Sequence, residues 1–256
     1  MTELKILTTS VIDHVALIEM RRVDKHNAFN RNLDEAVSVA LAEADADVDV
    51  HCAVLTGTGA AFSAGADMTE AVAAIDRKGR TEGMARTYAA AASFRKPLIA
   101  AVNGICYGGG ALVSILCDIR IASDDAAWRF PGAAYGLVVG GAQLPRIIGP
   151  AFAKDLLFTA RVVKADEALR IGLANTVYPR DRLMDEVMVL ARQIAQNSPP
   201  ALIATKDTVD RATAVDAGST AEAAHNRDLR TSPEHHARFK EAAKRVAARG
   251  PTQPQQ

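Results

Sequence analysis

The stretch that most constrains the fold lies near the middle of the chain, where a short apolar run meets three consecutive glycines. The run L98-I-A-A-V follows Pro97 and is typical of a buried strand. Gly108 to Gly110 come next, and A111-L-V-S-I-L-C continues as an apolar helical pattern. A strand, a glycine-rich turn and a helix start bring backbone N–H groups together with no side chains in the way. The sequence therefore predicts a main-chain receptor for an anion or an oxyanion.

A second glycine-rich turn, G57-T-G-A-A-F-S-A-G-A-D-M, follows another predicted buried strand, C52-A-V-L-T. Its start resembles a dinucleotide-binding fingerprint, but Phe62 occupies the third glycine position, and no acidic residue follows a clear second strand. The chain contains no phosphate-binding loop with Gly-Lys-Ser/Thr and no His-Glu-x-x-His motif. The pattern therefore argues against a nucleotide site and a zinc-protease site.

Composition narrows the class of protein further. The 256 residues are enough for one large domain or two small ones, and 30 basic residues balance 30 acidic residues. We therefore expect no long-range field that would recruit nucleic acid or an anionic membrane. The N-terminus does not resemble a signal peptide, and no run is long and apolar enough to predict a membrane span. The three cysteines lack metal-binding spacing, which favours buried reduced thiols and a cytoplasmic location.

The remaining pattern predicts an α/β body followed by helices. We expect two strands within 4–20 with a turn near Thr9 and Ser10, and a helix with a capping box formed by Asn32 and Glu35. Residues 69–95 read as helix with a break at Gly79 and Gly83, and the helices after residue 181 should break at 197–200 and near Gly218. The predicted organisation is an α/β core over 1–180, a helical region over 181–249 and a disordered tail over 250–256.

Taken together, these motifs resemble the crotonase superfamily, also called the enoyl-CoA hydratase/isomerase family. The resemblance covers about residues 5–245, and it is carried by K25-H-N-A-F-N, F62-S-A-G-A-D-M, K96-P-L-I-A-A-V-N-G-I-C-Y-G-G-G-A-L, C117-D-I-R-I-A, L144-P-R-I-I-G and A165-D-E-A-L-R-I-G-L-A-N. It implies an α/β fold, a crotonase-like spiral of β-β-α units, with a helical C-terminal trimerisation region. It also implies a homotrimer or hexamer, an acyl-CoA partner in which coenzyme A is part of the substrate, and no tightly bound cofactor.

The resemblance assigns site residues by motif position. The catalytic pair implied is the backbone N–H groups of Ala66 and Gly109, which would form an oxyanion hole for a thioester. The substrate-binding residues implied are Lys25, Ala28, Ala64, Asp67, Met68 and Tyr135. The backbone near Ala28 and Ala64 would contact adenine and Lys25 would face phosphate, whereas Asp67 also has a structural interpretation as a turn or cap residue.

Further side chains have simpler interpretations. Lys206 and Lys240 lie where the family places basic residues near coenzyme phosphates, but the pattern favours a plain exposed lysine at each position. His235 and His236 fall in a charged helical stretch, which predicts a solvated face rather than a metal site.

The chain departs from the family pattern where hydratases carry two glutamates. Leu112 occupies the first of these positions and Gly132 the second, so neither residue can transfer a proton. General acid–base catalysis is worth roughly 10²–10⁴-fold per participant. The segment G136-L-V-V-G-G-A-Q-L is also shorter than usual, which indicates a reshaped acyl site.

Tyr135 is the first alternative proton carrier. Two hypotheses remain: a lyase- or isomerase-class enzyme of acyl-CoA metabolism with a less demanding reaction, and a non-catalytic acyl-CoA binder or carrier.

Overall fold

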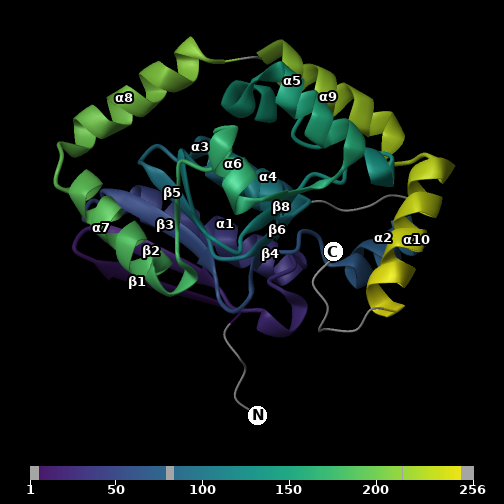
Figure 1. Cartoon of the computed structure of the whole chain (residues 1–256), viewed down its shortest axis with the longest axis horizontal. Helices are drawn as coiled ribbons and strands as arrows, with labels where there is room; N and C mark the ends of the chain where they lie inside the picture. The colour runs from purple at the N-terminus through teal and green to yellow at the C-terminus, as the bar shows by residue number, and fades with distance from the viewer. Residues whose placement is uncertain (1–5, 79–83, 215, 249–256) are drawn as a thin grey trace.

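Two β-sheets and the helices that cover them form the molecule, and the computed structural model describes residues 6–78, 84–214 and 216–248 (Figure 1). The larger sheet has the order β1-β2-β3-β5-β7-β10. Its first two strands are antiparallel and the other neighbours are parallel. The strands are β1 (Leu7–Ile12), β2 (Val15–Met20), β3 (Cys52–Gly57), β5 (Leu98–Val102), β7 (Ile119–Ser123) and β10 (Thr176–Tyr178).

A smaller sheet, ordered β4-β6-β8-β9, consists of three-residue strands. These strands are β4 (Ala61–Ser63), β6 (Ile105–Tyr107), β8 (Ala127–Arg129) and β9 (Val162–Lys164). Three times in succession the chain runs through a strand of the large sheet, then one of the small sheet, and then into helix: β3-β4, β5-β6 and β7-β8. This repeat confirms the predicted spiral of β-β-α units.

The helices of the spiral begin and end close to the predicted positions. They are α1 (Arg31–Ala46), α2 (Met68–Lys78), α3 (Ala85–Ser93), α4 (Gly109–Leu116), α5 (Leu144–Thr159) and α6 (Ala165–Arg170), with short 3₁₀ turns η1 (Val23–Lys25), η2 (Ala133–Tyr135) and η3 (Arg180–Arg182). Helix α5 is kinked at Gly149, which has φ +75° and precedes Pro150.

The core follows from alternation along the parallel strands, whose residues are buried on both faces. Leu55 and Ala100 face the main core, which contains the fully buried Phe62 and Trp128. Cys52, Val54, Ile99 and Ala101 face the other side, where α7 (Leu183–Ala195) covers them with Leu183, Val187, Ala191 and Ala195. A near-continuous apolar strand needs cover on both faces, and α7 supplies the second layer.

The last three helices lie around the outside of this body (Figure 1). Helix α8 (Pro199–Ala212) contains no buried residue and forms an outer edge of the view. Helix α9 (Asp216–Leu229) reaches the 138–142 loop through Glu222 and Asn226. Helix α10 (Pro233–Ala248) packs beside α2, where Phe239 joins Ala71 and Ile75. None of the helices described here is long and apolar enough to span a bilayer.

Three expectations about local structure are wrong: the position of the first turn, the cap of α1 and a helix break at Gly218. Thr9 and Ser10 lie inside β1, and the chain turns instead at Asp13 and His14, which have φ +51° and +64°. Asn30, not Asn32, caps α1, because its side chain accepts a hydrogen bond from the Leu33 N–H at 2.9 Å. Two short polar residues within three positions made the choice of cap ambiguous.

Gly218 does not break a helix, because it lies inside α9; the interruption falls after Ala212. Strand β6 was not anticipated, because a three-residue strand next to glycines has too little pattern to detect. The predicted break at Gly79 and Gly83 and the predicted disordered tail lie outside the described residues. The three cysteines are buried and free, as predicted.

Candidate functional site

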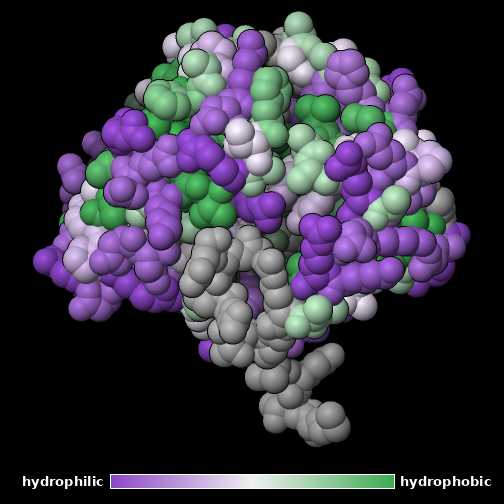
Figure 2. All heavy atoms as spheres, turned by 45° about the vertical axis from the view of Figure 1, so that its right-hand side comes forward, coloured by the Kyte–Doolittle hydropathy of each residue, from purple (hydrophilic) through white to green (hydrophobic). Residues whose placement is uncertain are grey.

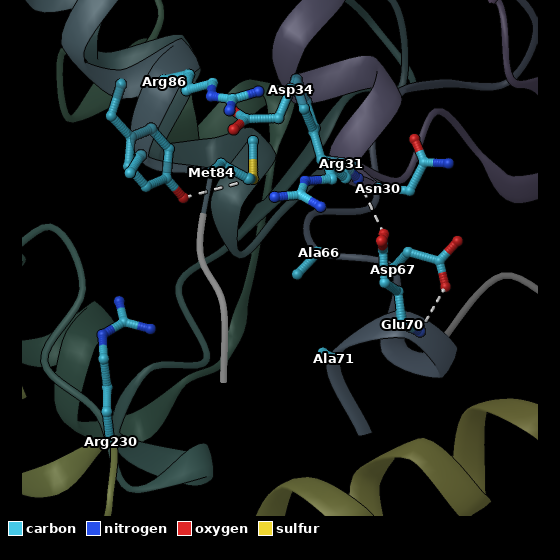
Figure 3. A pocket seen from close by; sticks show the side chains of 13 residues that line it. Asn30, Arg31, Asp34, Ala66, Asp67, Glu70, Ala71, Met84, Arg86 and Arg230 are labelled. Carbon is cyan, nitrogen blue, oxygen red and sulfur yellow. Dashed lines mark hydrogen bonds between the residues drawn. The ribbon is translucent and has the colours of Figure 1, made fainter. Parts of the chain in front are cut away.

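A cavity of about 430 Å³ opens beside the second glycine-rich turn (Figure 3). It lies between residues 29–34 at the start of α1, residues 66–71 at the start of α2, residues 84–88 at the start of α3, and Arg230 just after α9. Four segments far apart in the sequence thus meet at one place. The predicted oxyanion residue Ala66 is part of this lining.

The backbone around Ala66 directs its N–H away from the neighbouring chain. Phe29 forms a parallel bridge with Ala66, in which the Phe29 N–H donates to the Gly65 carbonyl at 2.7 Å and the Asp67 N–H donates to the Phe29 carbonyl at 2.8 Å. In a parallel bridge of this kind, the N–H of the central residue points to the opposite side. Among the described residues, the Ala66 N–H has no hydrogen-bond acceptor, so it is available to a ligand.

Gly109 is the first residue of α4, and its N–H has no acceptor within the helix. The preceding residue, Gly108, has φ +53° and caps the helix without a side-chain hydrogen bond. Gly65 lies directly against this point: a Cβ atom at residue 65 would stand 3.0 Å from the Gly109 nitrogen and 2.8 Å from the Tyr107 carbonyl oxygen. The glycine therefore lets the Ala66 turn and the α4 N-terminus approach closely.

Two side chains from the start of α3 cover Gly109. A Cβ atom on Gly109 would lie 2.2 Å from Met84 Sδ and 2.8 Å from the Tyr88 hydroxyl oxygen. The Tyr88 hydroxyl donates to Met84 Sδ at 3.5 Å, and both residues line the cavity (Figure 3). Burial raises the pKa of Tyr88, so its hydroxyl stays protonated and acts as a hydrogen-bond donor.

Asp67 has a set of hydrogen bonds that accounts for its position. One carboxylate oxygen pairs with Arg22 at 3.1 Å, and the other accepts from the Thr69 N–H at 3.1 Å and the Glu70 N–H at 3.4 Å. Asp67 thus holds the turn and the start of α2, although it also lines the cavity. Glu70 in turn accepts from the Arg31 N–H at 2.9 Å, which ties α2 to the start of α1.

The predicted coenzyme segment lies next to this turn. Lys25 is exposed at the end of η1, and its carbonyl accepts from the Ala28 N–H at 2.9 Å. The Ala64 N–H donates to the His26 carbonyl at 2.9 Å, so the two segments that the motifs assign to adenine lie side by side. Arg22 also donates to the Ala28 carbonyl, which anchors the same loop.

The two positions that the sequence assigns to absent glutamates, Leu112 and Gly132, are both buried. Leu112 is a buried member of the main core on α4. Gly132 is also buried, and a Cβ atom there would lie 2.9 Å from the Leu137 carbonyl oxygen and 3.1 Å from the Val139 nitrogen. The short loop after η2 therefore folds back onto Gly132 and fills the space of a side chain.

Met68 and Tyr135 do not line the cavity. Met68 and Tyr135 pack with the small cluster around Phe239, and the Tyr135 ring meets the Phe239 ring edge-on with 5.5 Å between centroids. The Tyr135 carbonyl accepts a hydrogen bond from His235 Nδ1 at 2.6 Å. His235 is fully buried, so the expectation of a solvated face is wrong for this residue.

The two lysines that follow the family positions are paired with carboxylates. Lys206 Nζ lies 2.8 Å from Asp118 and donates to the Lys96 carbonyl at 3.1 Å. Lys240 pairs with Asp76 on α2 at 2.5 Å. No cluster of side chains suited to hold a metal ion occurs within the described part of the chain.

Sequence reasoning missed the side chains that reach the cavity from α3 and from the end of α9. Met84 and Tyr88 stand four residues apart in an alanine-rich segment, and their spacing on one helical face was the available signal. Arg230 gave no such signal, because only tertiary packing brings it to this place.

Comparisons with known proteins agree with this architecture. The family model described as "Enoyl-CoA hydratase/isomerase" matches residues 11–254. The chain is 37% identical over 203 residues to a short-chain-enoyl-CoA hydratase of Clostridium acetobutylicum, covering 77% of this chain and 78% of the relative. It is 33% identical over 219 residues to a crotonyl-CoA hydratase of Syntrophomonas wolfei, covering 80% of this chain and 84% of the relative.

Solved structures give the same answer. An enoyl-CoA hydratase/isomerase from Xanthobacter autotrophicus Py2 superimposes with a TM-score of 0.84 at 27% identity, covering 96% of both chains. One from Pseudoalteromonas atlantica T6c gives a TM-score of 0.83 at 28% identity, covering 98% of this chain and all of that one. With the β-β-α spiral and the paired glycine-rich turns already in view, these matches show that the chain belongs to the enoyl-CoA hydratase/isomerase family, the crotonase superfamily.

Proposed function

We propose that this protein binds a coenzyme A thioester with the carbonyl oxygen between the N–H groups of Ala66 and Gly109. The observation that carries the proposal is that two backbone donors without acceptors come together at a glycine contact beside the cavity. When a thioester forms an enolate, negative charge develops on its oxygen, and fixed N–H donors stabilise that charge without reorganisation. The exposed Lys25 and the backbone of Ala28 and Ala64 would hold the coenzyme A part.

The reaction we propose is an enolate or thioester reaction other than ordinary hydration. Hydration needs one group to activate water and another to protonate the α-carbon. Leu112 and Gly132 supply neither, and Asp67 is already bonded to Arg22 and to two backbone N–H groups. Decarboxylation makes the smallest demand on side chains, because loss of carbon dioxide itself leaves the enolate that the oxyanion hole stabilises. Hydrolysis and a double-bond shift each need one proton-transferring group, where hydration needs two.

The second candidate function is a non-catalytic acyl-CoA binder or carrier. The crowding at Gly132 favours it, since the loop there leaves no room for a proton-transferring side chain. Both candidates require the same pocket, and they differ in whether any bound thioester is converted.

The test measures crotonyl-CoA turnover together with coenzyme A ester binding by calorimetry. We expect binding with hydration at least 10²-fold slower than in an ordinary hydratase. Hydration at an ordinary rate would refute the assignment of Leu112 and Gly132 as vacant positions. A protein that binds no coenzyme A ester would refute the pocket itself.

A pair of glycine variants tests the oxyanion hole directly. Gly65→Ala places a methyl group 3.0 Å from the Gly109 nitrogen, whereas Gly149→Ala places one where no atom lies within 4 Å. Both glycines have positive φ, so both substitutions strain the backbone, and they differ in the space around the added methyl group. We expect only Gly65→Ala to lower ester affinity, by about tenfold or more. Equal ester affinity in the two variants would show that the contact between Gly65 and Gly109 plays no part in ester binding.

We also propose that the protein is cytoplasmic and assembles as a homotrimer or a hexamer of two trimers. Helix α8 has no buried residue, and α5 exposes Phe152 and Phe158, the latter at 75%. Figure 2 shows one face of the molecule, on which smaller groups of hydrophobic side chains lie among hydrophilic ones. Light scattering after gel filtration gives the mass; a monomer at micromolar concentration would overturn the proposal.

A further inference from the structure

We infer that Tyr88 makes this site select acyl groups that carry an oxygen beyond the thioester, such as 3-oxo or 3-hydroxy acyl chains. The inference rests on the proposed coenzyme A ester pocket and names the class of acyl group that the pocket prefers. It depends on the environment of one hydroxyl group and on what a ligand must displace to reach Gly109.

The Tyr88 hydroxyl lies at the cavity with a poor partner. Its hydrogen bond goes to the thioether sulfur of Met84 at 3.5 Å, and a thioether is a weak acceptor. Because burial keeps the phenol protonated, the group is a donor throughout the physiological pH range. A partly buried donor that has only a weak acceptor gains from a ligand oxygen.

A ligand that reaches Gly109 also breaks this hydrogen bond. A Cβ atom on Gly109 would lie 2.2 Å from Met84 Sδ and 2.8 Å from the Tyr88 hydroxyl oxygen, so Met84 is the nearer cover. Gly109 does not line the cavity while Met84 covers it. Met84 has a flexible side chain, so an entering acyl group displaces its sulfur at little cost. The Tyr88 hydroxyl then needs another acceptor, and the acyl group is the nearest source.

The hydroxyl approaches Gly109 from a different side than the oxyanion position does. The Gly109 nitrogen faces Gly65 and therefore the Ala66 turn, whereas the Cβ side of Gly109 faces α3. The thioester oxygen belongs to the first side. The acceptor for Tyr88 is accordingly a second oxygen, further along the acyl group.

The rest of the lining also suits a polar acyl group. Charged side chains reach the cavity from α1, α2, α3 and the end of α9, including Arg31, Arg86 and Arg230 (Figure 3). Arg86 pairs with Glu35 at 2.8 Å, and the positive charge of Arg230 acts on the Tyr88 phenol, opposing the effect of burial on its pKa. These charged groups lie beside apolar lining residues such as Phe29 and Ala71, so an acyl group with both hydrocarbon and oxygen atoms finds partners for each.

The experiment compares three four-carbon esters by calorimetry: butyryl-CoA, 3-hydroxybutyryl-CoA and acetoacetyl-CoA. We expect the wild-type protein to bind the two oxygenated esters about tenfold more tightly than butyryl-CoA, because a site that donates to a ligand oxygen rejects the analogue lacking it. Tyr88→Phe keeps the ring and removes the hydroxyl. It should abolish that preference, because the loss of affinity falls mainly on the two oxygenated esters.

Tyr178→Phe is the matched control, because Tyr178 lies on β10 away from the cavity and packs with the α7 face of the sheet. It should keep the wild-type preference. Equal binding of all three esters by the wild-type protein, or an equal loss for all three in Tyr88→Phe, would overturn the inference while leaving the pocket intact. If none of the three esters binds, the coenzyme A pocket fails, and the inference fails with it.

Discussion

Asn27 is the residue on which the coenzyme-side loop most depends. It is fully buried and has φ +53°, a conformation that asparagine tolerates better than most residues. Its side-chain nitrogen donates to the Ala61 carbonyl at 2.7 Å and to the Thr58 carbonyl at 3.0 Å, while its backbone carbonyl accepts from the Ser63 hydroxyl at 2.8 Å. One side chain thus joins the Lys25 loop to the strand before Ala66.

Asn27→Asp should be far more disruptive than its size suggests. The substitution replaces a donor with a charged oxygen that faces two carbonyl oxygens in a buried site, so we expect the free energy of unfolding to fall by about 3 kcal/mol or more. Asn27→Ala, which only leaves the carbonyls unpaired, should cost about 2 kcal/mol. Urea denaturation measures both; an aspartate variant as stable as the alanine variant would contradict this account.

At the scale of single residues, the sequence predicted close backbone approach better than side-chain contacts. The contact between the two glycine-rich turns was anticipated because glycines and small residues mark such approach, and the oxyanion role of Ala66 and Gly109 stays a prediction. Tyr88 and Met84 were not, because their place depends on how α3 lies over α4. The motif residue Arg120 has a structural role, donating to the carbonyls of Leu173 at 2.7 Å and Cys117 at 2.8 Å.

At the level of elements, α10 is fastened to η2 through the buried His235. Its Nδ1 donates to the Tyr135 carbonyl, and Gly136 leaves just enough room, since a Cβ there would lie 3.2 Å from His235 Cα. Burial lowers the pKa of His235 below its ordinary value of 6.5. The neutral ring is therefore the form that the folded state prefers.

Acidification should loosen this attachment. As the pH falls through 6.5, the unfolded chain binds a proton at residue 235 that the folded chain resists, so this contribution to stability is lost. Between pH 7.5 and 5.5 we expect the wild-type unfolding free energy to fall more than that of His235→Asn, whose amide keeps a donor and does not titrate. Parallel pH profiles for the two proteins would rule out His235 as the source.

The ion pair between Lys206 and Asp118 is one of the contacts that attach helix α8. The Lys206 and Asp118 side chains are 13% and 29% exposed, and Asp118 also accepts from the Leu98 N–H at 2.8 Å. Burial raises the pKa of Asp118, and the Lys206 charge opposes that rise. The ion pair therefore connects α8 to the end of a central strand.

Lys206→Met should cost about 1–2 kcal/mol, because it leaves the Asp118 carboxylate half-buried without its cation. Adding Asp118→Asn should recover part of that loss by removing the unpaired charge. Thermal unfolding of the single and double variants measures the coupling. A double variant whose loss equals the sum of the two single losses would show that the pair is not coupled.

The elements whose boundaries the sequence predicted well are those with long apolar patterns, such as β3, β5 and α1. The short strands of the small sheet carried almost no pattern, since three residues cannot show alternation. The end of α8 was misplaced because Gly218 reads as a breaker, yet a single glycine is tolerated inside α9 at a cost of about 1 kcal/mol.

For the molecule as a whole, the three cysteine thiols can report opening of the core, because they lie inside it. Burial raises the pKa of Cys52 and of Cys117 to about 12 and raises that of Cys106 as well. The thiolate is the reactive form, so each thiol is protected both sterically and chemically.

A thiol-reactive disulfide reagent at pH 8 should therefore modify none of the cysteines in the folded protein and all three in denaturant. The rate in the absence of denaturant reports how often the core opens. Rapid modification of even one cysteine under native conditions would mean that the core opens locally near that thiol.

The folding-back of the loop onto Gly132 limits what a single substitution can add to this site. A Cβ atom at residue 132 would lie 2.9 Å from the Leu137 carbonyl oxygen and 3.1 Å from the Val139 nitrogen, which are backbone atoms that no rotamer change can move. Any side chain at this position therefore needs a rearrangement of residues 137–139 as well. A carboxylate engineered at residue 132 would have to come with a redesigned loop and not as a point mutation.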